Sequence, residues 1–366
     1  MAESQSLLSQ GLRGCVKLFV TACCGLMLAV PASAGGPIDQ SGYKVLPAIV
    51  RGNLAIFPVV TNRSYDTSQL LTLDEGVRSG QVTVTEAGNE PGLIRPGQAM
   101  PRRREGAEVN RLVLYNNSTH TLLLLAGEIV TGGKQDRVIG SDRIVPPKTG
   151  PIDLGVFCVE PGRWVASSAN FGSMGAQMAQ PSVRTPAMAE RDQNQVWANV
   201  RASNKKMAEN LSRSEAASVE GTSSYAKVFA SAPVAKMVST YGGAESEQAI
   251  LRELRAKGAV GVVVAVNGRV LWADVFASTE LLSKYWPKLM RSYVAEAMTS
   301  ASNGAAADLH EAELYMNVLA GGREVVETEP GVYRRTDITG DGFRVFELTA
   351  LLPKTGFDVH ITKIRQ

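Results

Sequence analysis

Short apolar runs, bounded by Gly, Pro or Asp, recur along the chain and predict a protein rich in β-strands. They form two groups, one in the N-terminal third of the chain and one near its C-terminal end. A helical turn is expected at residues 72–77, within the first group. The predicted strands are residues 54–60, 81–86, 111–115 and 121–125 in the first group, and 332–336, 343–348 and 359–364 in the second.

Helical periodicity lies mainly between these two groups of strands. Residues 190–218 predict one long helix or two short ones, and residues 246–257 predict a helix that stops at Gly258. An apolar stripe at three- and four-residue spacing predicts a further helix over residues 278–298. Pro287 lies inside this stripe, so either the helix kinks there or a new helix begins with the proline in its first turn.

The clearest local signal is Asn267-Gly268, which lies between the β-rich runs 262–266 and 269–275. Both residues tolerate positive φ, so the pair predicts a two-residue type I′ hairpin. Strands at both ends of the chain with helices between them predict an α+β fold. We expect a mostly antiparallel sheet or sandwich, formed by the N- and C-terminal strands, with the helices inserted in the middle.

Two segments show neither helical nor strand periodicity and are expected to be loops. Residues 91–104 are rich in Pro and Gly and end in Arg102-Arg103-Arg104, whose charges are expected to be solvated rather than to bind an anion. Residues 167–188 are rich in small and polar residues, and they predict a flexible surface loop. This loop would belong to a single domain spanning residues 35–366.

The first 34 residues have the pattern of a signal peptide. Arg13 and Lys17 form a positive n-region, residues 18–30 form an apolar h-region, and the small residues that end at Ala34 form a cleavage site. The sequence therefore predicts an exported protein, periplasmic or secreted, that is cleaved after Ala34. An uncleaved membrane anchor is the alternative, although the apolar run is short for a membrane span.

Cleavage would leave one cysteine and a nearly neutral chain. Three of the four cysteines precede the cleavage site, so no internal disulfide is expected, and the apolar neighbours of Cys158 favour a buried thiol over a nucleophile. Loss of Glu3, Arg13 and Lys17 lowers the formal net charge from +3 to +2. Such a balance offers no basic surface, so we expect no nucleic-acid partner. No transmembrane segment is expected after cleavage, and the sequence leaves the oligomeric state open.

The sequence motifs of common nucleotide sites are incomplete in this chain. A phosphate-binding loop needs Gly, four residues, then Gly-Lys-Ser/Thr. Counting back from Lys134 places Glu128 where the first Gly belongs, and Gln135 stands where the hydroxyl residue belongs. No Gly-x-Gly-x-x-Gly opens a helix after a predicted strand either. The sequence therefore supports neither of these nucleotide sites.

Metal sites are not indicated by the sequence, and it identifies no cofactor. His120, His310 and His360 are not at the spacing of zinc ligands, and each is expected to have a structural or surface role. Residues 337–342 resemble the first half of a calcium loop. The third position is Thr and the twelfth is Leu348, which favours a plain turn between two strands.

The densest group of reactive side chains lies in residues 122–164, where short apolar runs alternate with charged turns. If these strands are neighbours, the charged side chains would converge on one rim. The carboxylates would then act as a general base or accept a hydrogen bond from a sugar hydroxyl. The arginines would bind a phosphate or carboxylate group, and the tryptophan would offer a face on which a ligand ring can stack. The candidate catalytic residues are Glu128 and Glu160, and the candidate ligand-binding residues are Lys134, Gln135, Arg137, Arg163 and Trp164.

This stretch carries a family resemblance, together with a second block at residues 261–297. The residues that carry it are Gly127-Glu128, Gly133-Lys134-Gln135 with Arg137, Cys158-Val159-Glu160, and Gly162-Arg163-Trp164. The pattern resembles the ADP-ribosylglycohydrolase and rhodanese-phosphatase-superfamily-associated protein domain family. The resemblance covers most of the chain after about residue 45, and it implies no established activity. The family name implies a nucleotide or ADP-ribose-type ligand.

Three functional hypotheses follow from these observations. The first is a binding module for a small polar molecule of the nucleotide, ADP-ribose or sugar-phosphate type. The second is a hydrolase of such a ligand, in which Glu128 or Glu160 activates water. The third is a periplasmic or cell-surface interaction domain whose Glu and Arg residues form a purely structural network. A pocket with an unpaired carboxylate would favour the hydrolase, and fully paired carboxylates without a cavity would favour the interaction domain.

Overall fold

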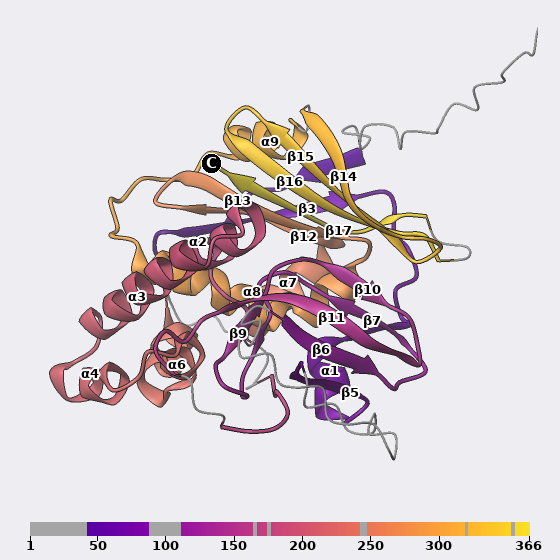
Figure 1. The fold of residues 1–366 in the computed structure, drawn as a ribbon. Helices are drawn as coiled ribbons and strands as arrows, with labels where there is room; N and C mark the ends of the chain where they lie inside the picture. Colours follow the sequence, from indigo (N-terminus) through magenta and orange to yellow (C-terminus); the bar gives the residue numbers. More distant parts are fainter. Residues whose placement is uncertain are drawn as a thin grey trace, which may run out of the picture. The chain divides into compact units, whose positions relative to one another are not determined.

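Strands from both ends of the chain share one nine-stranded antiparallel sheet in the computed structural model of the protein (Figure 1). The structure describes residues 42–87, 111–163, 167–173, 177–241, 247–318, 321–352 and 356–366. This sheet confirms the predicted α+β class. Its order is β1 (Tyr43–Val45), β3 (Leu54–Thr61), β12 (Ala259–Val266), β13 (Arg269–Phe276), β17 (Asp358–Arg365), β16 (Phe343–Ala350), β15 (Tyr333–Gly340) and β14 (Gly322–Glu329), and β2 (Ile49–Arg51) pairs with β3.

The predicted hairpin lies at the centre of this sheet and joins β12 to β13. Asn267 and Gly268 have φ of 54° and 79°, as a type I′ turn requires, so the prediction is confirmed. Every residue of β12 is buried because the strand is covered on both faces. Val262 and Val264 pack into the core on one face, and Val263 packs into the core on the other.

Two smaller sheets contain the strands of the central motif. β6 (Arg111–Asn116) and β7 (Thr121–Leu124), which flank the turn at residues 116–119, belong to different sheets. The Asn116 side chain holds this turn by donating to the carbonyls of His120 and Pro146, both at 2.9 Å. The three-stranded sheet has the order β10 (Arg143–Val145), β7 (Thr121–Leu124) and β4 (Leu70–Thr72). The five-stranded sheet has the order β5 (Val82–Glu86), β6 (Arg111–Asn116), β11 (Thr149–Cys158), β9 (Arg137–Ile139) and β8 (Ile129–Val130).

One long helix, α8 (Thr279–Thr299), lies between the large sheet and the strands of the motif (Figure 1). The Ser278 hydroxyl caps its N-terminus by accepting a 3.0 Å hydrogen bond from the amide of Leu281. Pro287 lies inside the helix, so the helix does not restart at the proline. Trp286 is fully buried in a core that also contains Leu123 of β7. The apolar stripe predicted from the sequence is therefore the central packing element of the fold.

The opposite face of the large sheet is covered by α9 (Leu309–Asn317), whose Ala312, Tyr315 and Met316 pack against it. No helix in the described part of the chain is both long and apolar enough to span a membrane. The two helices that the sequence allowed in residues 190–218 are α3 (Gln193–Glu209) and α4 (Arg213–Glu220). Further α-helices of the described chain are α1 (Leu73–Arg78), α5 (Tyr225–Ala230), α6 (Ala232–Thr240) and α7 (Glu247–Ala256).

The prediction of a flexible loop at residues 167–188 is wrong for its second half. There the chain forms α2 (Pro181–Thr185) and the π-helix η2 (Pro186–Glu190), and both contribute buried side chains. Gln180 fixes the start of this segment, because its Oε1 accepts a 2.6 Å hydrogen bond from the hydroxyl of Ser203 in α3. The local composition was misleading because this segment is ordered by tertiary contacts. The arginines at 102–104 lie outside the described residues.

Candidate functional site

The predicted motif folds into a polar network that closes the turn at Gly132 and Gly133. The Arg163 guanidinium lies 2.6 Å from the Glu160 carboxylate and donates a 3.1 Å hydrogen bond to the carbonyl of Gly133. The Glu160 carboxylate also accepts a 3.2 Å hydrogen bond from the amide of Asp136. Burial raises the pKa of Glu160, but the hydrogen bonds from Arg163 and Asp136 outweigh it and lower that pKa. Glu160 is therefore a satisfied, ionised partner of Arg163.

Asp136 is the centre of this network, although the sequence analysis did not single it out. One carboxylate oxygen accepts a 3.0 Å hydrogen bond from the amide of Gly132, and the other accepts a 2.5 Å hydrogen bond from the hydroxyl of Ser224. Ser224 also caps α5, so the carboxylate joins the motif to that helix. Burial raises the pKa of Asp136, and the hydrogen bond from Ser224 opposes that rise.

Gln135 and Arg137 are buried inside the same region. The Arg137 guanidinium donates a 2.7 Å hydrogen bond to the carbonyl of Gln135 and lies 3.9 Å from the carboxylate of Glu86. The amide of Lys134 donates a 2.9 Å hydrogen bond to the same carboxylate. These contacts hold the backbone of the turn. Trp164 lies outside the described residues.

Glu128 lies apart from the other predicted site residues. It is 1% exposed, its carboxylate binds the ammonium group of Lys288 from α8, and its second oxygen accepts a 2.7 Å hydrogen bond from the amide of Leu125. The same ammonium group binds Asp74 of α1. Burial raises the pKa of Glu128, and the charge of Lys288 opposes that rise. The structure therefore places the two candidate catalytic carboxylates in two separate networks.

A third buried network lies between the large sheet and the motif. Asp274 of β13 and Arg184 of α2 pair through two contacts, of 3.0 and 3.2 Å. His360 of β17 lies between Asp274 and Asp142, with ring nitrogens 3.3 and 2.6 Å from their carboxylates. Burial opposes protonation of His360, but Asp142 and Asp274 outweigh it and raise its pKa to about 9. Asp274 also accepts hydrogen bonds from Trp272, Tyr293 and Thr362.

Cys158 is buried, as its neighbours predicted, and burial raises the pKa of its thiol to about 11. The side chain of Gln193 forms hydrogen bonds with the backbone amide and carbonyl of Cys158, at 2.8 and 2.9 Å.

Asp337, from the calcium-like turn, lies within β15, with its carboxylate 3.6 Å from the guanidinium of Arg344. Among the described residues no group of His, Cys, Asp and Glu is arranged to hold a metal ion.

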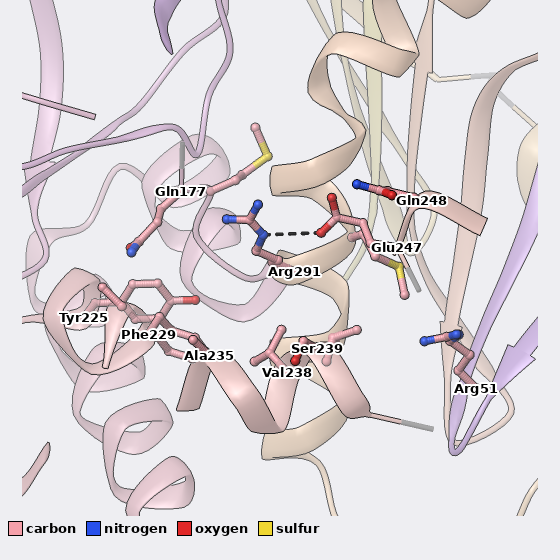
Figure 2. Close-up of a pocket in the computed structure, with 14 residues that line it drawn as sticks. Arg51, Gln177, Tyr225, Phe229, Ala235, Val238, Ser239, Glu247, Gln248 and Arg291 are labelled. Atoms are coloured by element: carbon pink, nitrogen blue, oxygen red, sulfur yellow. Dashed lines mark hydrogen bonds and ion pairs between the residues drawn. The ribbon is translucent and has the colours of Figure 1, made fainter. Parts of the chain in front are cut away.

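A cavity of about 640 Å³ lies beside α8, and none of the predicted site residues that the structure describes lines it. Helices α5 and α6 form one side and α8 forms another, and the start of α7, residues 177–178 and the end of β2 complete the lining (Figure 2). Several lining residues, such as Ala235 and Ser239, are exposed, so the cavity opens at the surface. The apolar walls include Met178, Phe229, Val238, Met290 and Val294.

Polar side chains enter this cavity at a few places. Arg291 of α8 and Glu247 of α7 form an ion pair, with Nε and Oε2 3.4 Å apart (Figure 2). Arg51 enters from the end of β2, and its guanidinium donates a 3.3 Å hydrogen bond to the carbonyl of Tyr241. Gln177 donates a 3.1 Å hydrogen bond to the carbonyl of Ala226.

No local pattern in the sequence indicates this cavity, because its walls come from segments that are far apart in the chain. Arg51 precedes Gly52 in a short turn, and Arg291 is one of several charged residues of α8. Neither position matches a motif. Only the packing of α5 and α6 beside α8 brings these residues together.

A comparison with known protein families identifies the chain. The family model of the ARG and Rhodanese-Phosphatase-superfamily-associated Protein domain, ARPP-1, matches residues 42–362, which run from the start of the large sheet into β17. No curated protein and no solved structure is significantly similar to the chain. The matched region includes the motif from Glu128 to Arg163 and all three buried networks. The chain therefore belongs to the ARPP-1 family, which the motif resemblance had indicated.

Proposed function

We propose that this protein is a binding module that holds a small organic molecule in the cavity beside α8. The observation that carries the proposal is the cavity itself, whose volume of about 640 Å³ lies within the usual range for ligand sites. Its lining combines apolar walls with a few polar groups, which is the usual composition of such sites. The carboxylates of Glu128 and Glu160 are engaged elsewhere, so binding is better supported than hydrolysis.

We propose a nucleotide, ADP-ribose or sugar-phosphate type of ligand. Phe229 of the lining stacks on Tyr225 with ring centroids 4.4 Å apart, and this pair offers a flat apolar surface. Gln177, Gln248 and Ser239 can bond hydroxyl groups, and arginine suits phosphate. The family name supports the same class of ligand, because ARG denotes ADP-ribosylglycohydrolase.

The binding proposal is tested by thermal unfolding of the purified protein with ADP-ribose, AMP or glucose phosphate. A ligand at a hundred times its dissociation constant should stabilise the folded protein by about 2.7 kcal/mol. Ala235→Phe, which places a ring in the cavity, should abolish the shift. Ala232→Phe is the matched control, because Ala232 is an exposed residue of α6 outside the lining.

Two results would count against the proposal. If no ligand raises the unfolding midpoint, the protein does not take this class of molecule, and an interaction domain becomes the better hypothesis. If a ligand still raises the unfolding midpoint of Ala235→Phe, binding occurs at another site.

We also propose that the protein is exported. The support is the signal-peptide pattern of residues 1–34, with Arg13 and Lys17 before the apolar run. N-terminal sequencing of the protein recovered from its native cells should begin at Gly35. Recovery of the intact N-terminus in the cytosolic fraction would refute export.

A further inference from the structure

We infer that the cavity binds an anionic group of its ligand, a carboxylate, phosphate or sulfonate, on the guanidinium of Arg51. This inference rests on the proposed function, because it assigns the chemistry of one end of the same cavity. It adds that the ligand is an organic anion with an apolar, flat part.

Arg51 is a buried cation with little compensation. The residue is 4% exposed and lines the cavity. Its Nη1 donates to the carbonyl of Tyr241 at 3.3 Å, and its buried Nη2 has no hydrogen-bond partner in the described part of the chain. No carboxylate of the described residues lies within 4.0 Å of its guanidinium, so none of them compensates the positive charge of Arg51.

The other buried arginines of the described chain show what such a residue normally has. Arg137, Arg184 and Arg335 each lie within 4.0 Å of a carboxylate, at 3.9, 3.0 and 2.8 Å respectively. An arginine cannot escape the penalty of burial by losing its proton, because the guanidinium remains charged at any ordinary pH. A buried arginine without a counter-charge is therefore unfavourable unless a ligand supplies that charge.

The carboxylate that lines the cavity does not supply that charge. Glu247 pairs with Arg291, so the lining contains two guanidinium groups and one carboxylate. In Figure 2, Arg51 and the Tyr225–Phe229 pair lie on opposite sides of the Arg291–Glu247 pair. This arrangement suits a ligand with a negative group at one end and a flat apolar part at the other.

Gln177 adds a second unsatisfied group to the same cavity. Its amide nitrogen donates a hydrogen bond to the carbonyl of Ala226, but its buried Oε1 has no hydrogen-bond partner among the described residues. A hydroxyl or amino group of the ligand would satisfy this oxygen. Within the described chain, the cavity thus offers an unpaired donor on Arg51 and an unpaired acceptor on Gln177.

The test compares two fluorescent probes that share a flat aromatic body. Anilinonaphthalene sulfonate carries one negative charge, and N-phenylnaphthylamine is neutral. Titrations of both probes should give tighter binding of the sulfonate by about tenfold, the gain expected of one charge-assisted contact. In Arg51→Met this preference should vanish while the neutral probe binds as before. Arg252→Met is the matched control, because Arg252 is exposed on α7 and does not line the cavity.

A stability measurement separates a ligand role of Arg51 from a structural one. Removal of an uncompensated buried charge should leave the unfolding midpoint unchanged or raise it. If Arg51→Met instead lowers the midpoint and keeps the probe preference, Arg51 is a structural tie to Tyr241, and the inference is wrong.

The same titrations distinguish this inference from the proposed function. If both probes bind the wild type equally and Ala235→Phe removes both, the cavity binds ligands but has no anion preference. If neither probe binds, or if both bind Ala235→Phe as they bind the wild type, the inference about Arg51 fails, and the thermal shifts with ADP-ribose, AMP and glucose phosphate decide the proposed function separately.

Discussion

His360 Nδ1 lies 2.6 Å from a carboxylate oxygen of Asp142, and this contact ties the last strand of the large sheet to the start of β10. The other oxygen of Asp142 accepts a 2.7 Å hydrogen bond from the amide of Ala126, at the beginning of the motif. The second ring nitrogen of His360 lies near Asp274 of β13. One imidazolium thus joins the large sheet to the start of β10 through Asp142 and contacts the neighbouring strand through Asp274, and its charge state should control how firmly the two sheets are joined.

The contribution of His360 to stability should fall as the pH rises from about 6.5 to about 9. His360 has a pKa of about 9 in the folded protein, and an unfolded histidine titrates near 6.5. Its contribution to the free energy of unfolding is therefore complete below about pH 6.5 and is lost as the pH rises through 9. The loss should approach about 3 kcal/mol. Urea unfolding at a series of pH values measures it.

His360→Gln is the control for this pH dependence. This variant lacks the contribution of His360, so the difference between its free energy of unfolding and that of the wild type should shrink as the pH rises. Lys363 acts in the opposite sense, because burial lowers its pKa to about 7, but its effect cancels in the comparison. A difference that stays constant between pH 6.5 and 9.5 would show that His360 is not protonated in the folded protein.

Lys288→Met should be strongly destabilising at neutral pH. The substitution leaves the carboxylates of Glu128 and Asp74 without their shared cation, and such a loss usually costs about 3–5 kcal/mol. Because burial already favours the protonated form of Glu128, the defect should shrink as the pH falls towards 5. Urea unfolding at pH 5 and pH 8 measures the change. Lys236→Met, on the exposed side of α6, is the control and should have little effect at either pH. A destabilisation of Lys288→Met that is equal at pH 5 and pH 8 would contradict the assigned charges.

Much of the fold could be predicted from local patterns. The Asn267-Gly268 turn and the stripe of α8 were recognisable because each depends on residues close together in sequence. The helix at residues 181–190 was not, because Arg184 is ordered by Asp274, ninety positions away. β14 was missed because its side chains are mostly exposed and carry no apolar alternation.

The sequence also identified which residues are chemically unusual, but not what they do. Glu160 and Arg163 do pair, which was one of the two expected arrangements. Glu128 was assigned to the same rim, yet it binds Lys288, whose position in the middle of an apolar helix gave no sign of that partner. The cavity was not foreseen, because its polar groups Arg51 and Gln177 come from separate segments.

Gly127→Ala should destabilise the protein by roughly 2–4 kcal/mol. Gly127 has φ of 96°, and an added Cβ would lie 2.5 Å from Nε of Arg184. Arg184 cannot move aside, because it is fully buried and held by Asp274 through two contacts. Gly155→Ala is the control, since its Cβ would meet nothing within 4 Å. Equal unfolding midpoints for the two variants would show that the packing against Arg184 is not tight.

Arg163→Gln should lower stability without weakening ligand binding in the cavity. Its loss leaves Glu160 and Asp136 with less compensation, which should cost about 1–3 kcal/mol. The ADP-ribose shift should persist, because Arg163 does not line the cavity. Arg213→Gln, at an exposed position on α4, controls for the loss of one charge. The reverse result, with an unchanged midpoint and no ligand shift in Arg163→Gln, would make the motif the binding site and refute the assignment to the cavity.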